Sequence, residues 1–141
     1  GVAPQRLCIE ITEGVLMDVD RAQRMLAELV ACGLTISIDD FGTGFSSLSY
    51  LKRFPIHELK IARGFVDGIS SSADDRAIGS AIIALARNLG MSVVAEGVEQ
   101  PDQHAQLDAS GCDHGQGFLY SRPLTADEFV HWLQERGRSD G

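Results

Sequence analysis

A chain of 141 residues, 44% of them hydrophobic, is long enough for one globular domain with a core and too short for two ordinary ones. Twenty acidic residues against twelve lysines and arginines give a net charge of -8, which excludes bulk attraction to DNA, RNA or an anionic membrane surface. The three cysteines, Cys8, Cys32 and Cys112, are widely spaced and form no CxxC pattern. They indicate neither a disulfide framework nor a zinc site, and we expect a reducing, cytoplasmic setting.

Short β-branched segments alternate with longer segments of helical periodicity along the chain. The predicted strands are 7–12, 34–39, 58–62, 92–96 and about 114–119. Apolar residues spaced as on one helix face predict a helix that stops at Gly33 and another that stops at Gly90. The polar segment 70–75 is the only linker-like stretch. This βαβα order predicts an α/β fold.

The last predicted helix begins with a capping-box pattern. Thr125 would be the N-cap, and Glu128 follows three residues later. We expect Phe129 and Trp132 of this helix to pack in the core.

Side-chain alternation gives the predicted strands two different faces. One face is apolar and suits helix packing: Ile9, Ile11, Ile36, Ile38, Leu59, Ile61, Val93 and Ala95. The other face carries one polar side chain per strand, at or near its C-terminal half: Glu10, Asp39, Lys60, Glu96 and Gln116. In parallel sheets and barrels this end of the strands binds ligands.

A polar mouth of this kind fits a (βα)8 barrel better than a doubly wound sheet, which helices cover on both faces. A complete barrel takes about 250 residues and eight strands. We therefore expect the C-terminal portion of a TIM-type (βα)8 barrel, with about five strands alternating with helices.

Carboxylates gather with Lys60 at this end of the predicted sheet: Glu10, Asp39, Asp40 and Glu96. Oxygen ligands from neighbouring strands are what Mg²⁺ and Mn²⁺ require. The adjacent pair Asp39 and Asp40 suits two metal ions about 4 Å apart, an arrangement used in phosphodiester hydrolysis. Bound cations would also let an acidic protein hold an anionic substrate.

Each of these residues also has an ordinary structural interpretation. Two aspartates at a strand end usually form a turn or a helix cap, and Lys60 could be a surface lysine. Gly42 and Gly44 could serve only a tight turn, and Gln116, between two glycines, could mark a strand kink. What favours function is the coincidence that five successive strands place a polar group on the same face.

Five motifs in order span nearly the whole chain: EITE at 10–13, DDFGTGFSSLSYL at 39–51, LKIA at 59–62, AEGVE at 95–99 and GCDHGQGFLYSRP at 111–123. This set resembles the EAL-domain family of cyclic di-GMP phosphodiesterases. The resemblance implies a TIM barrel with one strand reversed and hydrolysis of cyclic di-GMP to linear pGpG with Mg²⁺ or Mn²⁺, two ions being expected. It implies that residues 1–141 are a partial EAL domain.

The resemblance also implies roles for individual residues. Glu10, Asp39 and Asp40 would be metal ligands, Lys60 would hold the catalytic water or a phosphate oxygen, and Glu96 would be the general base. Positions that contact substrate or support the site would be Gln116, Glu13, Glu99, Gly42, Thr43, Gly44 and Phe45. Among these, Glu13 would steady the loop 41–47.

Two departures from the family pattern bear on activity. The Glu-Ala-Leu motif and the asparagine ligand that follows it belong to the N-terminal part of the domain and are absent here, and position 62 is Ala where the family usually has Asp. We therefore expect the chain alone to be inactive. The alternative function is a catalytically silent module that binds cyclic di-GMP or a partner protein.

The resemblance makes cyclic di-GMP the expected partner molecule, without direct membrane contact. A homodimer, or pairing with the missing part of the domain, is also expected. A third interpretation is an enolase-like barrel in which Lys60 is a base beside Mg²⁺.

Overall fold

Five parallel strands form one sheet in the computed structural model, which describes residues 1–44 and 51–136. They are β1 (Cys8–Thr12), β2 (Thr35–Phe41), β3 (Glu58–Ile61), β4 (Ser92–Glu96) and β5 (His114–Gln116), in that order across the sheet. Each strand pairs in parallel with the next one along the chain. Doubly wound sheets reverse their strand order, whereas a TIM-type barrel keeps it. The predicted portion of a TIM-type barrel is confirmed, and the reversed strand is not among the five described.

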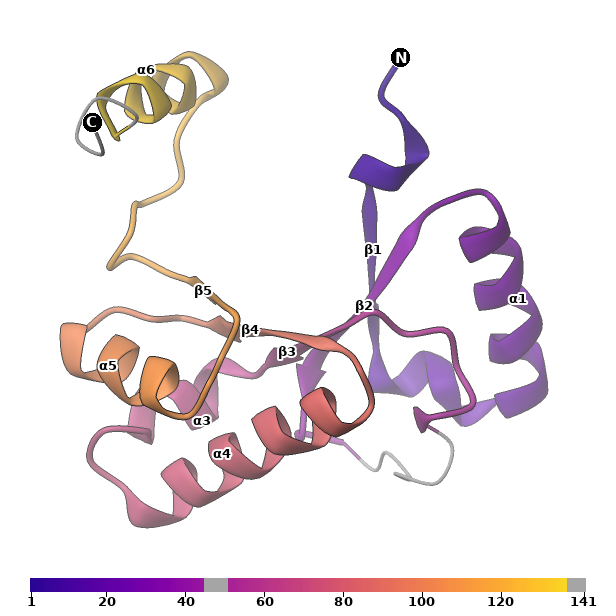
Figure 1. Ribbon diagram of the computed structural model, residues 1–141, viewed down its shortest axis with the longest axis horizontal. Coiled ribbons are helices and arrows are strands. Elements are labelled where there is room, and N and C mark those ends of the chain that lie inside the picture. The colour runs from indigo at the N-terminus through magenta and orange to yellow at the C-terminus, as the bar shows by residue number, and fades with distance from the viewer. Residues whose placement is uncertain (45–50, 137–141) are drawn as a thin grey trace.

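Helices connect the strands, and all but the last of them cover one face of the sheet (Figure 1). They are α1 (Val19–Ala31), α3 (Arg63–Gly68), α4 (Ala73–Asn88), α5 (Pro101–Ala109) and α6 (Ala126–Arg136), with short 3₁₀ helices η1 (Pro4–Arg6) and η2 (Glu13–Met17). Helix α1 contacts β2, and α4 contacts β3 and β4. Gly33 and Gly90 follow α1 and α4 with φ of 89° and 74°, the left-handed conformation that terminates helices.

The segment 70–75 is not a linker throughout. Ser72 is the N-cap of α4, and its side chain accepts a hydrogen bond from the Asp75 N–H at 3.2 Å. The polar residues of this segment therefore include the N-cap and the first turn of α4, where such residues are favoured. Sequence periodicity also missed α3, which has six residues, and α5, whose buried residues are Gln103 and Leu107.

The core lies between the sheet and these helices. The strand residues predicted to face helices are fully buried on the three central strands: Ile36, Ile38, Leu59, Ile61, Val93 and Ala95. Ile9 on β1 differs, because 36% of it is exposed. β1 is the outer strand, and beside it an apolar groove of about 580 Å³ runs between Ile9 and Met25 of α1.

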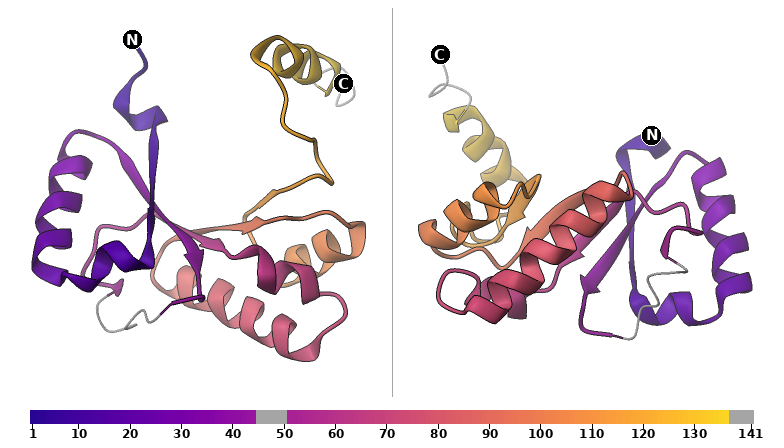
Figure 2. Two further views of the ribbon diagram at one scale, coloured as in Figure 1. Left: turned by 180° about the vertical axis from the view of Figure 1, so that it is seen from behind. Right: turned by 60° about the horizontal axis from the view of Figure 1, so that its bottom comes forward.

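The prediction that α6 packs in the core is wrong, because none of its residues is buried. It follows an extended segment and lies apart from the sheet (Figures 1 and 2). The capping box forms, because the Thr125 N–H donates to Glu128 Oε2 at 2.8 Å and the Glu128 N–H donates to Thr125 Oγ1 at 3.4 Å. Phe129 is nevertheless 49% exposed and stacks on Trp132, with ring centroids 6.0 Å apart. A capping box determines where a helix begins, but not which surface covers it.

Within the described residues, no helix is both long enough and apolar enough to cross a membrane.

The burial of α4 gives a direct test of the fold. Ile83 is 1% exposed and Ile78, on the same helix, is 40% exposed. We expect Ile83→Ala to lower the free energy of unfolding by about 2–5 kcal/mol, because it leaves a cavity in the core. Ile78→Ala, the same change on the same helix, should cost less than about 1 kcal/mol. Urea denaturation followed by circular dichroism measures both, and equal losses would contradict this packing.

Candidate active site

Polar side chains from four strands meet around the Lys60 ammonium at the C-terminal end of the sheet. The carboxylates that its Nζ contacts are Glu10 Oε1 at 2.9 Å, Asp39 Oδ1 at 3.2 Å and Glu96 Oε1 at 2.6 Å. They come from β1, β2 and β4, while Lys60 comes from β3. The structure thus brings together four of the five polar side chains that strand alternation predicted.

Lys60 is the buried member of this cluster. Its side chain is 6% exposed, whereas those of Glu96 and Glu10 are 20% and 52% exposed. Burial disfavours the charged amine, but hydrogen bonds to Glu96, Glu10 and Asp39 outweigh it and raise the pKa of Lys60 above its ordinary value. A lysine held in its charged form suits electrostatic stabilisation. It does not suit the base of an enolase-like reaction, which needs a neutral amine.

A β-bulge keeps Asp39 and Asp40 on the same side of the sheet. In a regular strand two successive side chains point to opposite faces. The register of β2 against β3 shifts between Ile38 and Phe41, and Asp40 has a φ of 52°, which is uncommon for a residue other than glycine. Two hydrogen bonds hold this conformation: the Asp40 N–H donates to Asp39 Oδ1 at 3.1 Å, and the Thr43 hydroxyl donates to the Asp40 carbonyl oxygen at 2.9 Å.

The bulge creates a group of oxygen donors. One carboxylate oxygen each from Asp39, Asp40 and Glu96 lies within 4.8 Å of the others. All three donors are carboxylates, the ligand type that Mg²⁺ and Mn²⁺ prefer, so the donor set fits such an ion. Glu10, predicted as a metal ligand, lies outside this group and contacts Lys60 instead.

Glu13 holds the start of the loop that follows the two aspartates. It is 8% exposed, and its Oε1 accepts a hydrogen bond from the Gly42 N–H at 2.6 Å. Its Oε2 is buried without a hydrogen-bond partner among the described residues. A Cβ at Gly44 would lie 2.8 Å from this oxygen, so a side chain there would force the Glu13 carboxylate to shift. Phe45 lies outside the part of the chain that the structure describes.

Glu99 forms an ion pair at the same end of the sheet with Arg63, a residue that sequence analysis did not single out. Arg63 Nη2 donates to Glu99 Oε1 at 2.7 Å and so connects α3 with the segment after β4. A Cβ at Gly97 would lie 2.5 Å from Arg63 Cγ, so glycine allows the arginine to cross. No local sequence pattern joins residues 36 positions apart. Gln116 is exposed and pairs in the sheet register with Glu96.

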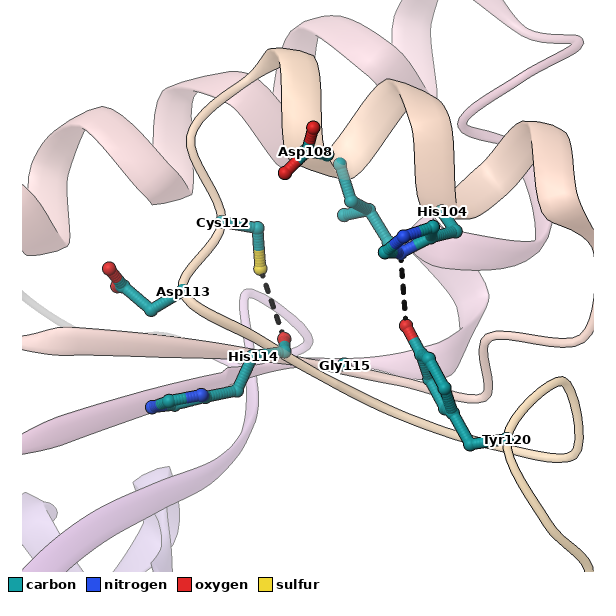
Figure 3. Close-up of a pocket in the computed structure, with 8 residues that line it drawn as sticks. His104, Asp108, Cys112, Asp113, His114, Gly115 and Tyr120 are labelled. Carbon is teal, nitrogen blue, oxygen red and sulfur yellow. Dashed lines mark hydrogen bonds between the residues drawn. The ribbon is translucent and has the colours of Figure 1, made fainter. Parts of the chain in front are cut away.

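A small cavity lies elsewhere, between α5 and β5 (Figure 3). The Tyr120 hydroxyl lies 3.1 Å from His104 Nδ1, and the Cys112 thiol donates to the His114 carbonyl oxygen at 3.3 Å. Burial raises the pKa of both Cys112 and Tyr120, so both side chains stay in their protonated forms near neutral pH. The cavity is about 80 Å³, well below the roughly 300 Å³ at which ligand pockets begin. The acidic cluster, where four carboxylates converge with a buried ammonium, is the candidate site.

Comparison with known proteins identifies relatives over most of the chain. The EAL domain family model matches residues 1–123. The bifunctional diguanylate cyclase/cyclic di-GMP phosphodiesterase MucR of Pseudomonas aeruginosa is 50% identical over 131 residues, which cover 92% of this chain and 19% of MucR. The signaling protein YkoW of Bacillus subtilis is 47% identical over 134 residues, which cover 94% of this chain and 17% of YkoW. The chain thus spans about a fifth of the length of these relatives.

Solved structures give the same result for the fold. The PaMucR phosphodiesterase in complex with c-di-GMP matches with a TM-score of 0.87 and 49% identity, over 91% of this chain and 52% of that one. The manganese/cy-diGMP complex of Klebsiella pneumoniae BlrP1 at pH 9.0 matches with a TM-score of 0.81 and 37% identity, over 88% of this chain and 32% of that one. With the family model matching most of its length, this chain belongs to the EAL domain family.

Proposed function

We propose that residues 1–141 are a partial EAL domain that supplies part of an active site for hydrolysing cyclic di-GMP to linear pGpG. The observation that carries this proposal is the group of carboxylate oxygens from Asp39, Asp40 and Glu96, which lie within 4.8 Å of one another beside the Lys60 ammonium. Relatives named as cyclic di-GMP phosphodiesterases support the choice of substrate.

Mg²⁺ or Mn²⁺, in up to two sites, is the cofactor of this proposal. Asp39 and Asp40 would hold the ions, and Glu10 would join them as the family resemblance implies. When bound, such ions lower the pKa of a water molecule and neutralise charge on a phosphodiester. The BlrP1 complex with manganese and cyclic di-GMP supports this choice.

Glu96 and Lys60 have complementary roles in this proposal. The Glu96 carboxylate has one oxygen within 4.8 Å of the aspartate oxygens and also contacts the Lys60 ammonium, so it would take a proton from the attacking water. Lys60 presents a fixed positive charge toward the negative charge that develops on the phosphate oxygens. Gln116, on the neighbouring strand, would contact the substrate. Gly42, Thr43 and Gly44 of the loop 41–47 would contact the substrate or support the site.

Completion of the site needs further polypeptide next to β1. The apolar groove between Ile9 and Met25 supports this, because a surface of that kind favours coverage. We place there the part of the barrel that the solved MucR domain contains beyond the 52% matched here. A homodimer of this chain is the alternative occupant. Cys8, Cys32 and Cys112 are all free, which is consistent with a cytoplasmic location.

A second candidate function rests on Ala62. It is 3% exposed and is the N-cap of α3, without a side-chain capping hydrogen bond. It directly follows β3, two residues after Lys60, at the position where the family usually has a carboxylate. This substitution favours a module that binds cyclic di-GMP without hydrolysing it.

Hydrolysis can be tested in a complete barrel made by replacing the matching region of the MucR phosphodiesterase with this chain. We expect the chain alone to release no pGpG, and the chimera to release it with Mn²⁺ and to stop when a chelator is added. Glu96→Gln should lower turnover by about 10²- to 10⁴-fold, because it removes a general base. Glu28→Gln on α1 is the matched control, and pGpG is measured by chromatography. Equal turnover in the two variants would contradict the role of Glu96.

Position 62 separates the two candidate functions. We expect Ala62→Asp to raise turnover of the chimera and to add about 0.5–2 kcal/mol to the free energy of unfolding by capping α3. Ala62→Asn is the control, because asparagine caps a helix as well as aspartate but brings no charge. Turnover and urea denaturation are measured for both. Binding of cyclic di-GMP without pGpG formation, in the chimera and in Ala62→Asp alike, would favour the silent module.

A further inference from the structure

We infer that Lys60 is an internal counter-ion that competes with a divalent cation for the same carboxylates. Its ammonium contacts acidic side chains of three other strands. A cation that binds must take over two of those side chains. This inference rests on the cation site of the proposed function, but not on hydrolysis.

The cluster stays negatively charged even with the lysine in it. Four carboxylates belong to the cluster, namely Glu10, Asp39, Asp40 and Glu96, and the single ammonium reduces their total charge from -4 to -3. Lys60 is 6% exposed, so water screens its interactions poorly. Without this ammonium, the carboxylates would repel one another across β1, β2 and β4.

The lysine and a cation would share ligands. The carboxylates that could surround a cation are those of Asp39, Asp40 and Glu96. Two of them, Asp39 and Glu96, already bond to Lys60 Nζ at 3.2 and 2.6 Å. A cation among these oxygens would lie a few ångströms from the ammonium, and the two positive charges would repel. A bound cation therefore weakens the contacts of the Lys60 ammonium with these carboxylates, and the ammonium weakens binding of the cation.

Glu10 is the partner of the ammonium that lies outside the group of Asp39, Asp40 and Glu96. Its Oε1 lies 2.9 Å from Lys60 Nζ, and its side chain is 52% exposed. With one cation among Asp39, Asp40 and Glu96, the lysine can thus release Asp39 and Glu96 while it keeps its ion pair with Glu10. Lys60 would then remain charged beside the cation instead of leaving the site. A second ion that Glu10 joined would compete for this last partner as well.

The experiment compares Lys60→Met with Lys52→Met in the full chain without any nucleotide. Lys52 is an exposed lysine, so both variants lose one positive charge, but only the first changes the cluster. We expect Lys60→Met to melt at a lower temperature than Lys52→Met in chelator. Its affinity for Mn²⁺, measured by calorimetry, should be at least about tenfold higher than that of the wild type, because one repelling charge is gone. Lys52→Met should bind Mn²⁺ like the wild type.

A second measurement uses the wild type and so does not depend on the folding of a variant. An amine-acylating reagent is applied with and without Mn²⁺, and the modification of Lys60 relative to Lys52 is followed by mass spectrometry. We expect Mn²⁺ to raise this ratio, because Lys60 loses two of its ion pairs. An unchanged ratio would overturn the inference.

The outcomes also separate this inference from the proposed function. If Lys60→Met binds Mn²⁺ equally or more weakly than the wild type, Lys60 only positions the carboxylates. The inference that Lys60 competes with the cation is then wrong, while the cation site stands. If neither the wild type nor any variant binds Mn²⁺, the competition and the cation site both fail.

Discussion

The contact on which this end of the molecule depends is one buried ammonium surrounded by carboxylates of three other strands. The Lys60 side chain reaches Glu10, Asp39 and Glu96 at 2.6–3.2 Å, so charge ties β1, β2 and β4 to β3. Backbone hydrogen bonds join β3 directly to β2 and β4, but not to β1. Acidic side chains on adjacent strands destabilise a sheet unless a positive charge lies among them. The parallel register brings these groups to one end, and the lysine makes their proximity tolerable.

The second constraint is the bulge of β2. Asp40 adopts a left-handed φ of 52°, a conformation that costs free energy for a residue other than glycine. The structure retains it through the hydrogen bonds of Thr43 and Asp39 and through Glu13, which fixes Gly42 directly after the bulge. The strained backbone of Asp40 is thus supported both by its sequence neighbours Asp39 and Thr43 and by Glu13 of η2. Such a combination is typical of a functional site, where the direction of a side chain matters more than the stability of the strand.

Sequence reasoning predicted the parts of this structure that depend on regular periodicity. The five strands, their apolar faces and the meeting of Glu10, Asp39, Lys60 and Glu96 all follow from two-residue alternation and parallel order. Alternation by itself would have placed Asp40 on the opposite face, and no pattern indicated the bulge that prevents this. Arg63 was missed because its partner Glu99 is distant in sequence. Phe129 was misplaced because apolar character predicts that a side chain needs a cover, but not that the cover belongs to the same fold.

The two edges of the sheet differ in length, and this difference affects self-assembly. β1 has five residues and β5 has three. Two copies joined head to tail would pair β1 of each with β5 of the other, and part of every β1 would keep unsatisfied backbone groups at the seam. The net charge of -8 adds repulsion between copies. Strand length and charge together therefore act against a closed ring of identical chains and leave the longer edge free for a polypeptide of a different kind.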